Sequence, residues 1–331
     1  MSQIKKPVFI DLFAGAGGLS LGLEQAGFQP VFVNELNPDA MKTYLINRKE
    51  HEYLEKFKEH DIKQMVKGKY LDNLLTKLKI NFQIDCEQGD LDLIVGGPPC
   101  QGFSGIGHRR SYSVSKDQVP SNFLFKDMAD VISRLQPKMF LFENVRGIRN
   151  TWWQGNSMKK NAWEEIQHAF DSIENYDINA ALIFGKDYGA PQNRPRMLLV
   201  GLHHDLGIKS DVTTSKVAGG FLPEPSVDCP HIEELIGDLV DDSYQNGGET
   251  LTYPKPATKD IQRRYFRENA KTGKVLPKGA PVTEHKYSKH SGSVIHKFQY
   301  MIENNGKIPD SKKTKKFAQR LLPRKWGNNG P

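Results

Sequence analysis

The sequence contains little cysteine, and its cysteines do not follow the spacings of disulfide-rich or zinc-binding domains. Cys86, Cys100 and Cys229 are an odd number in 331 residues, and no two of them form a Cys-x-x-Cys pair. A disulfide framework and a zinc site are therefore not indicated, and a reducing, cytoplasmic setting fits. The chain also lacks any apolar run of the roughly 18 residues that a membrane span needs, and its start has no signal-peptide pattern. We expect no membrane partner.

Length and charge set broad limits on what the chain does. Its 331 residues correspond to one large or two medium domains. The net charge of +7 permits a polyanionic partner without requiring one. Between Lys307 and Lys325 there are eight basic residues against a single acid, Asp310. A solvated face and a nucleic-acid contact both explain such a run.

The first sixty residues predict a unit that binds a nucleotide-like ligand. An apolar strand over 8–13 enters the glycine-rich segment 14–18, and a helix follows. The spacing is Gly-x-Gly-Gly and not Gly-x-Gly-x-x-Gly, so a dinucleotide is not the first choice. A second strand over 30–34 ends at Glu35, where a carboxylate would accept both ribose hydroxyls. The alternative is a surface acid before the helix start at Asn37-Pro38-Asp39.

Cys100 stands at the end of the central apolar segment. Residues 91–95 read as a buried strand, which breaks on Gly96-Gly97-Pro98-Pro99. In an α/β sheet, residues just past the carboxyl end of a strand face the ligand. A small buried cysteine at a strand end is the alternative. The prolines before it and the Gln-Gly-Phe-Ser after it favour a side chain held at the rim of a cleft.

Glu143 stands at the end of the next predicted strand. A helix with an apolar stripe over 124–135 precedes this strand, which covers 139–142. Glu143 should therefore leave the same sheet edge as Cys100, although a strand-end acid that caps the next turn is the alternative reading. Arg194 and Arg196 lie between two further predicted strands, at positions i and i+2, which point the same way on extended chain.

Taken in order, these segments resemble the C5-cytosine DNA methyltransferases of bacterial restriction–modification systems. The resemblance covers most of the chain and is carried by Asp11 to Gly18, Asn34-Glu35, Asp61-Ile62, Pro99-Cys100-Gln101, Glu143-Asn144-Val145 and Gln192-x-Arg194-x-Arg196. It implies an α/β fold, a Rossmann-like S-adenosylmethionine-dependent methyltransferase sheet with helices on both faces. It also implies a partial, irregular DNA-recognition region.

The resemblance assigns roles to particular residues. Cys100 would attack C6 of a flipped-out cytosine in double-stranded DNA, and Glu143 would bind the exocyclic amine and N3. Arg194 and Arg196 would hold the base or neutralise charge, and residues 105–121 would form a mobile lid. S-adenosyl-L-methionine would be the methyl donor, with no metal. Its expected contacts are Phe13, Ala14, Gly15, Gly17, Gly18, Glu35, Leu36, Asp61, Ile62, Pro99 and Leu124.

The resemblance also predicts a division of the chain and an incomplete end. Residues 1–202 are expected to form the catalytic and cofactor-binding domain, and 203–331 the lead-in to, or part of, the target-recognition region. The family's last two motifs have no convincing counterpart, since no apolar strand precedes Gly327-Asn328-Asn329-Gly330. We therefore expect a fragment, a disrupted gene product or one subunit of a split enzyme. A complementary polypeptide would then supply the missing motifs. A cognate restriction endonuclease is expected as a system partner, not necessarily in contact.

Two other functions remain open at this level. A tRNA cytosine-5 methyltransferase would use the same cofactor unit and the same chemistry on a different polymer. A nicotinamide-dependent oxidoreductase, or a protein that only binds nucleotides, would also begin with a strand, a glycine turn and a helix. The Gly-x-Gly-Gly spacing and the Pro-Cys-Gln run count against this second class. The sequence does not assign the bases that the protein reads.

Overall fold

The computed structural model describes residues 6–99, 120–154, 159–208, 217–225, 229–269, 272–304 and 306–313. The chain forms two compact units. The first combines Met1–Ile183 with Pro195–Glu224, and the second combines Phe184–Arg194 with Pro225–Pro331. The sequence analysis divided the chain by function, into a catalytic part before residue 203 and a recognition part from residue 203 onward. That division stays a prediction.

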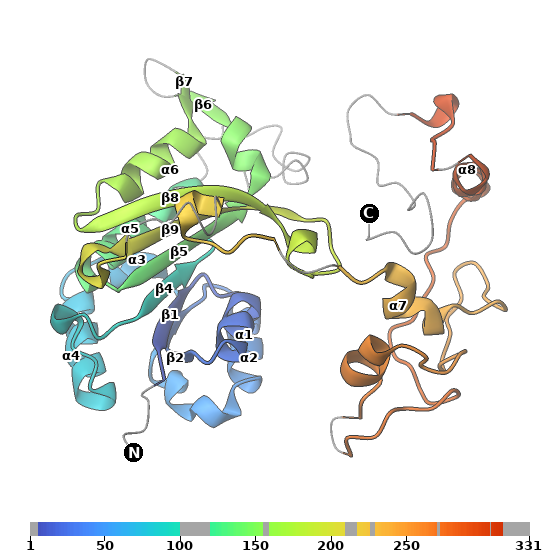
Figure 1. Ribbon diagram of the computed structural model, residues 1–331, viewed down its shortest axis with the longest axis horizontal. Helices are drawn as coiled ribbons and strands as arrows, with labels where there is room; N and C mark the ends of the chain where they lie inside the picture. Colours follow the sequence, from blue (N-terminus) through green and yellow to red (C-terminus); the bar gives the residue numbers. More distant parts are fainter. Residues whose placement is uncertain are drawn as a thin grey trace. The chain divides into compact units, whose positions relative to one another are not determined.

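The first unit is built on a mixed seven-stranded sheet in the order β3-β2-β1-β4-β5-β9-β8 (Figure 1). Strands β3, β2, β1, β4 and β5 run parallel to their neighbours, and β9 runs antiparallel to β5. A separate hairpin is formed by β6 and β7. The strands are β1 Val8–Leu12, β2 Gln29–Asn34, β3 Lys58–Glu59, β4 Leu93–Gly96, β5 Met139–Val145, β6 Trp152–Gln154, β7 Lys159–Asn161, β8 Tyr176–Phe184 and β9 Pro195–His203.

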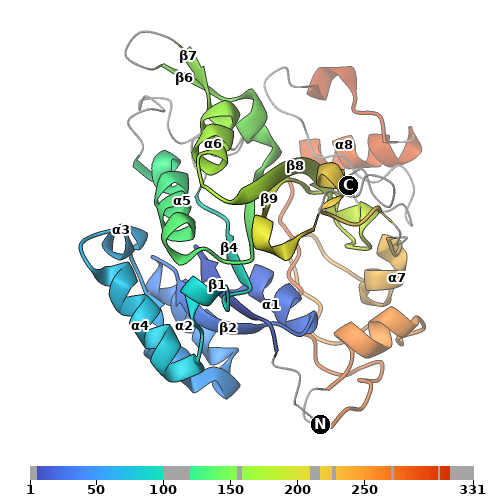
Figure 2. The ribbon, with the colours of Figure 1, turned by 60° about the vertical axis from the view of Figure 1, so that its left-hand side comes forward.

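Helices cover both faces of this sheet, as the sequence predicted (Figure 2). Alternate residues of β1 face opposite ways: Ile10 and Leu12 pack in the larger core with α3 to α6, and Phe9 packs against α1. Val33 of β2 packs against α2. The helices of the first unit are α1 Gly18–Gln25, α2 Pro38–Ile46, α3 Ile62–Met65, α4 Tyr70–Phe82, α5 Leu124–Leu135 and α6 Ala162–Asp171.

Short 3-10 helices connect these elements. In the first unit they are η1 Lys49–Glu55, η2 Cys86–Gln88, η5 Pro120–Phe123, η6 Arg146–Asn150, η8 His204–Leu206 and η9 Val217–Gly220. The charged segment 49–58 consists of η1 followed by the start of the edge strand β3. Segment 63–82 carries most of α3 and all of α4.

The second unit is organised around a buried cation. The guanidinium of Arg267 lies 3.0 Å from Asp238, donates to the Lys255 carbonyl at 2.7 Å and stacks 3.5 Å from the centre of the Tyr253 ring. These contacts join segments that the sequence analysis left as irregular. The helices here are η7 Gly185–Asp187, α7 Ile232–Ile236, η10 Gly237–Leu239, the π-helix η11 Gln262–Phe266, α8 Gly292–Glu303 and η12 Asp310–Lys312.

No helix among the described residues combines the length and the apolar character needed to cross a bilayer.

Close packing between β5 and β9 generates a first prediction, for Gly201→Ala. Gly201 pairs with Phe140, and an added Cβ would lie 2.1 Å from the Phe140 ring, which is fully buried against Phe170 and Tyr176. We expect this substitution to lower the free energy of unfolding by about 1 to 3 kcal/mol in urea denaturation.

Gly22→Ala is the matched control. Gly22 lies in α1, where an added Cβ meets nothing within 4 Å. This change should raise stability by roughly 0.5 to 1 kcal/mol, because alanine loses less backbone entropy than glycine on folding. Equal effects of the two substitutions would contradict the packing argument.

Candidate active site

The predicted site segments that follow the parallel strands begin near one row of paired residues across that part of the sheet. Along this row Glu59 pairs with Asn34, Asn34 with Leu12, Leu12 with Gly96 and Gly96 with Phe142. The chain leaves the sheet, or nears its end, at the residues that follow each of them. Because the strands are parallel, their carboxyl ends form a common edge, where ligands bind in open α/β sheets.

Glu35 lies against the glycine turn at this edge. Its Oε2 accepts a hydrogen bond from the Gly15 N–H at 2.8 Å, and its Oε1 accepts one from the Asn37 N–H at 2.7 Å. Asn37 caps α2, so the carboxylate also supports the start of that helix. Each carboxylate oxygen has a second acceptor position. The geometry is therefore compatible with both readings of Glu35, because it can support the helix and still accept ribose hydroxyls.

The glycine turn is crowded on one side and open on the other. Phe13 has a φ of 58°, Gly15 of 58° and Gly17 of 90°, so three residues in five adopt left-handed backbone. A Cβ added to Gly15 or Gly18 would meet nothing within 4 Å, whereas one added to Gly17 would lie 2.4 Å from Arg48 Nη1. Unfilled space beside Gly15 and Gly18, next to the Glu35 carboxylate, suits the close approach of a nucleoside-type ligand.

The buried side chain of Asn34 fixes three strand ends together. Its Oδ1 accepts from the Phe13 N–H at 3.4 Å, and its Nδ2 donates to the carbonyls of Glu59 and His60 at 2.9 and 3.1 Å. The sequence analysis treated this residue only as the neighbour of Glu35. Its role could have been predicted from its position as the last residue of a buried strand, because a buried side-chain amide needs hydrogen-bond partners.

The remaining predicted cofactor contacts have different surroundings. Leu36 is 69% exposed and Pro99 is also exposed. Asp61 caps α3 through a 3.0 Å bond from the Lys63 N–H. Ile62 and Leu124 pack in or against the main core. Leu36 thus offers apolar surface at the carboxyl end of β2, whereas Ile62 is almost fully buried, and contact of either residue with a ligand stays a prediction.

Glu143 meets the loop that leads towards Cys100. Its carboxylate forms an ion pair with Arg196, which stands opposite Val145 on β9. A Cβ added to Gly97 would lie 2.9 Å from Glu143 Oε2, and Asn144 Nδ2 donates to the Pro98 carbonyl at 3.2 Å. The chain after β4 is therefore held against the end of β5. The structure brings together Glu143, Arg196 and the residues that immediately precede the predicted nucleophile.

Two of the predicted catalytic residues are not placed beside Glu143. Cys100 lies outside the described residues, as do 101–119, which make up most of the predicted lid. Arg194 belongs to the second unit, whereas Arg196 belongs to the first. Their roles stay predictions.

The two cysteines that the structure describes are unsuited to nucleophilic attack. Cys86 and Cys229 are both buried, with free thiols. Burial raises the pKa of Cys86 to about 12 and also raises the pKa of Cys229. A thiolate is the reactive form of cysteine, so neither residue competes with Cys100 for this role.

A buried polar network lies beneath the glycine turn. Ser20 Oγ donates to Asp11 Oδ2 at 2.5 Å and lies 2.8 Å from the Tyr44 hydroxyl. Burial raises the pKa of Asp11 to about 7, although the Ser20 hydrogen bond and the charge of Arg48 oppose that rise. The sequence analysis matched Asp11 as the first residue of the turn segment and assigned it no role.

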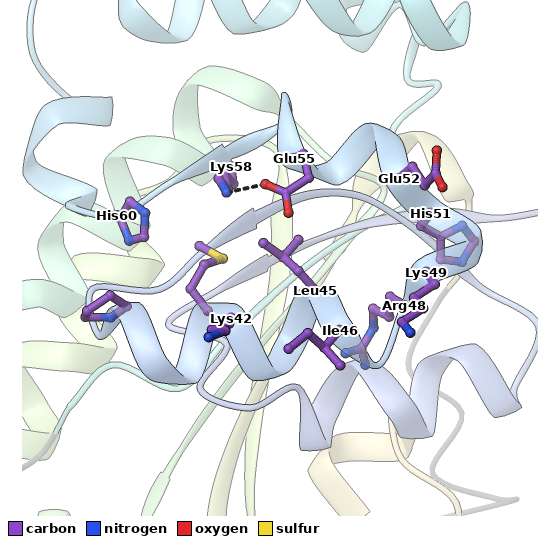
Figure 3. A pocket seen from close by; sticks show the side chains of 12 residues that line it. Lys42, Leu45, Ile46, Arg48, Lys49, His51, Glu52, Glu55, Lys58 and His60 are labelled. Atoms are coloured by element: carbon purple, nitrogen blue, oxygen red, sulfur yellow. Dashed lines mark hydrogen bonds and ion pairs between the residues drawn. The ribbon is translucent and has the colours of Figure 1, made fainter.

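A cavity of about 800 Å³ lies between α2 and the segment 48–60 (Figure 3). Its lining includes Lys42, Lys49 and Lys58, and Lys58 is paired with Glu55 at 2.5 Å. None of the turn residues 13–18 lines it, and neither does Glu35 or Glu143. This cavity is therefore separate from the row of residues described above.

Among the described residues, no group of three or more His, Cys, Asp or Glu side chains is arranged to hold a metal ion.

The buried carboxyl group of Asp11 generates a second prediction. Because its pKa in the folded chain lies above the usual value of 3.8, folding favours proton uptake. The stabilisation from this uptake is complete below about pH 4 and is lost as the pH rises through about 7. Relative to Asp11→Asn, the free energy of unfolding of the wild type should fall by a few kcal/mol over this range.

Urea unfolding of both proteins from pH 4 to pH 8 measures the effect. The comparison cancels the titration of the other carboxyl groups, and the neutral amide can still accept from Ser20. Parallel stability curves for the two proteins would show that Asp11 does not titrate in this range.

Comparison with known proteins gives a consistent result. The family described as C-5 cytosine-specific DNA methylase matches residues 8–326. The Type II methyltransferase M.DdeI of Desulfomicrobium norvegicum is 30% identical over 87% of this chain and 59% of its own length. The Type II methyltransferase M.XorII of Xanthomonas oryzae pv. oryzae is 31% identical over 76% of this chain and 52% of its own. The chain thus spans a little over half the length of these relatives.

A solved structure supports the fold assignment. The crystal structure of a DNA modification methyltransferase encoded within an E. coli prophage shares a TM-score of 0.51 and 26% identity with this chain. The match covers 78% of this chain and 64% of that one. These findings exclude the reading as a nicotinamide-dependent oxidoreductase and confirm the predicted methyltransferase sheet. The chain belongs to the C-5 cytosine-specific DNA methylase family.

Proposed function

We propose that this chain carries the catalytic part of an enzyme that methylates C5 of a cytosine within a specific sequence of double-stranded DNA. The observation that carries the proposal is the row of paired residues Glu59, Asn34, Leu12, Gly96 and Phe142. It sets the glycine turn, Glu35, the Gly97–Pro98 loop and Glu143 along one sheet edge. This arrangement supports a donor site and a base site that lie next to each other, as methyl transfer requires.

The residues along this edge fit S-adenosyl-L-methionine, which supplies an electrophilic methyl group when bound. Glu35 would accept the ribose hydroxyls, since its two oxygens already face the turn and the start of α2. The open side of Gly15 and Gly18 would receive the donor, and Leu36 would contact its adenine ring. Phe13, Ala14, Gly17, Asp61, Ile62, Pro99 and Leu124 complete the proposed donor site.

Cys100 would supply the nucleophile. C5 of cytosine is a poor nucleophile, and addition of a thiolate at C6 converts the ring into an enamine that can attack a methyl group. Once C5 carries the methyl group, loss of the C5 proton to a base restores the double bond and expels the thiolate. The target atoms cannot be reached inside a stacked duplex, so the cytosine must be flipped out at a cost of a few kcal/mol.

Glu143 would stabilise the ring during attack at C6. A carboxylate beside the base can accept hydrogen bonds from the exocyclic amine and from protonated N3. Arg196 forms an ion pair with the Glu143 carboxylate and is partly exposed, so it can turn towards the base. Arg194 is the second arginine proposed to hold the base or neutralise charge.

The biological setting is part of the same proposal. Protection of host DNA from a cognate restriction endonuclease in the cytoplasm fits the Type II methyltransferases that this chain resembles. A polypeptide that supplies further recognition surface fits the share of those relatives that the chain spans. Without it, we expect DNA to bind mainly through phosphates, with a steep salt dependence and little sequence preference.

A trapped covalent adduct tests the proposed function. With a 5-fluorocytosine oligonucleotide and S-adenosylmethionine, no C5 proton can leave, so the cysteine should stay bonded to C6. We expect wild type to form an adduct that survives denaturing electrophoresis, and Cys100→Ser to form none. A single turnover suffices, so slow chemistry is detected.

The assay is run on DNA and on tRNA, with the chain alone and mixed with the C-terminal part of a relative. Cys86→Ala and Cys229→Ala are matched controls that should retain the adduct. An adduct with Cys100→Ser would refute the assignment of the nucleophile. An adduct on tRNA alone would replace the proposed substrate.

Glu143→Gln tests the proposed role of the carboxylate. The amide keeps the size of the side chain but loses the charge, so the rate of methyl transfer should fall by about 10² to 10⁴. Donor affinity should not change. Glu174→Gln, at an exposed surface position, is the control. Tritiated methyl transfer measures the rate, and near-wild-type activity of Glu143→Gln would contradict this role.

A further inference from the structure

Arg48 is a buried arginine whose guanidinium holds two different groups. It follows α2, and its side chain is 4% exposed. Its Nε and Nη2 donate to the two carboxylate oxygens of Glu24 at 2.7 and 2.8 Å, and Nη2 also donates to the Gly17 carbonyl at 3.0 Å. The guanidinium stacks 3.9 Å from the centre of the Tyr44 ring.

The Gly17 carbonyl is a critical point of the glycine turn. It accepts the first hydrogen bond of α1, from the Leu21 N–H at 3.0 Å, and the Gly17 N–H closes the turn on the Ala14 carbonyl at 3.0 Å. Gly17 is the N-cap of α1 and has no side chain with which to support the helix start. Arg48 supports it from outside, in the space that a Cβ on Gly17 would occupy.

The contacts continue to the strand below the turn. The Tyr44 hydroxyl lies 2.8 Å from Ser20 Oγ, which donates to Asp11 of β1. The turn is thus connected to β1, α1 and α2 by side chains on one face of the sheet. Such connections are needed because left-handed backbone at Phe13, just before the turn, is unfavourable unless its surroundings hold it.

We propose that Arg48 is a positioning residue that holds the Gly17 carbonyl and thereby keeps the glycine turn in the shape that accepts the methyl donor. The inference rests on the proposed function. Arg48 acts from the crowded side of the turn, whereas the space beside Gly15 and Gly18 is open. Arg48 also lines the cavity that adjoins α2 (Figure 3).

The chemistry of the pair also favours this role over simple stabilisation. Replacing a buried ion pair with apolar side chains is often neutral or stabilising, whereas removing one partner alone is costly. Stability therefore does not require a buried Arg48–Glu24 pair. A planar fork that reaches both a carboxylate and a carbonyl does require arginine, because a lysine ammonium is a compact point charge.

The test separates stability from positioning with a double variant, Arg48→Met with Glu24→Leu. It removes both charges together, so its stability in urea should stay near that of wild type. Titration with S-adenosylhomocysteine, the demethylated form of the donor, should show at least a ten-fold loss of affinity. Arg48→Lys retains a charge partner for Glu24 and should also bind this ligand at least ten-fold more weakly. This variant provides the test if the double variant does not fold.

Tyr53→Phe is the matched control. It removes a partly buried hydrogen bond to the Pro30 carbonyl in the same unit, at the other end of β2 from Glu35. It should lower stability while leaving ligand affinity within two-fold of wild type.

Hydrogen exchange of the ligand-free proteins gives a readout that does not depend on the donor. Amides over residues 14–21 should exchange at least ten-fold faster in the double variant and in Arg48→Lys than in wild type or Tyr53→Phe. If wild type binds no S-adenosylhomocysteine, the proposed function fails, and the exchange data still decide whether Arg48 holds the turn. Wild-type affinity together with wild-type protection in both Arg48 variants would overturn the inference.

Discussion

The candidate site depends on the register of the parallel strands. Side chains on a strand alternate between the two faces, so a slip of one residue would turn every side chain of that strand to the opposite face. In the observed register, Asp11 faces α1 and α2, while Ile10 and Leu12 face the larger core. The same register aligns the ends of β3, β2, β1 and β4 beside β5, so that residues distant in sequence meet at one edge. Apolar burial on two faces thus fixes where the polar groups emerge.

Much of this edge could be predicted because its signals are local. An apolar run followed by glycine or proline marks where a strand ends, and the next polar residue is then a candidate for the site. This reasoning found the glycine turn, Glu35 and Glu143 before any contact was known. Their chemistry followed from a resemblance spread over six separate segments, which limits the chance of accidental agreement. The prediction of helices on both faces of the sheet followed from the same resemblance.

The rest could not be predicted because it depends on contacts between distant segments. Strand β3 has only two residues and is defined by its pairing with β2, so no periodicity reveals it. The hydrogen-bond partners of Asn34 lie more than twenty residues away in sequence, as do the Glu24 and Gly17 partners of Arg48. The second unit is held by a buried arginine whose contacts join residues 238, 253 and 255, and no local pattern in that region indicates which arginine becomes buried.

Two arginine–glutamate ion pairs of the first unit differ in how far they are exposed to water, and this difference suits them to different roles. In the Arg48–Glu24 pair behind the glycine turn, the arginine side chain is only 4% exposed, so removing Glu24 would leave a buried guanidinium without its carboxylate. The Arg196–Glu143 pair is partly exposed, with side chains 22% and 31% accessible, so water can replace either partner at small cost. The first pair is therefore suited to hold a fixed shape. The second is suited to exchange, because either of its partners can separate from the other without leaving a buried charge uncompensated, and the proposed contact of Glu143 with a base relies on such an exchange.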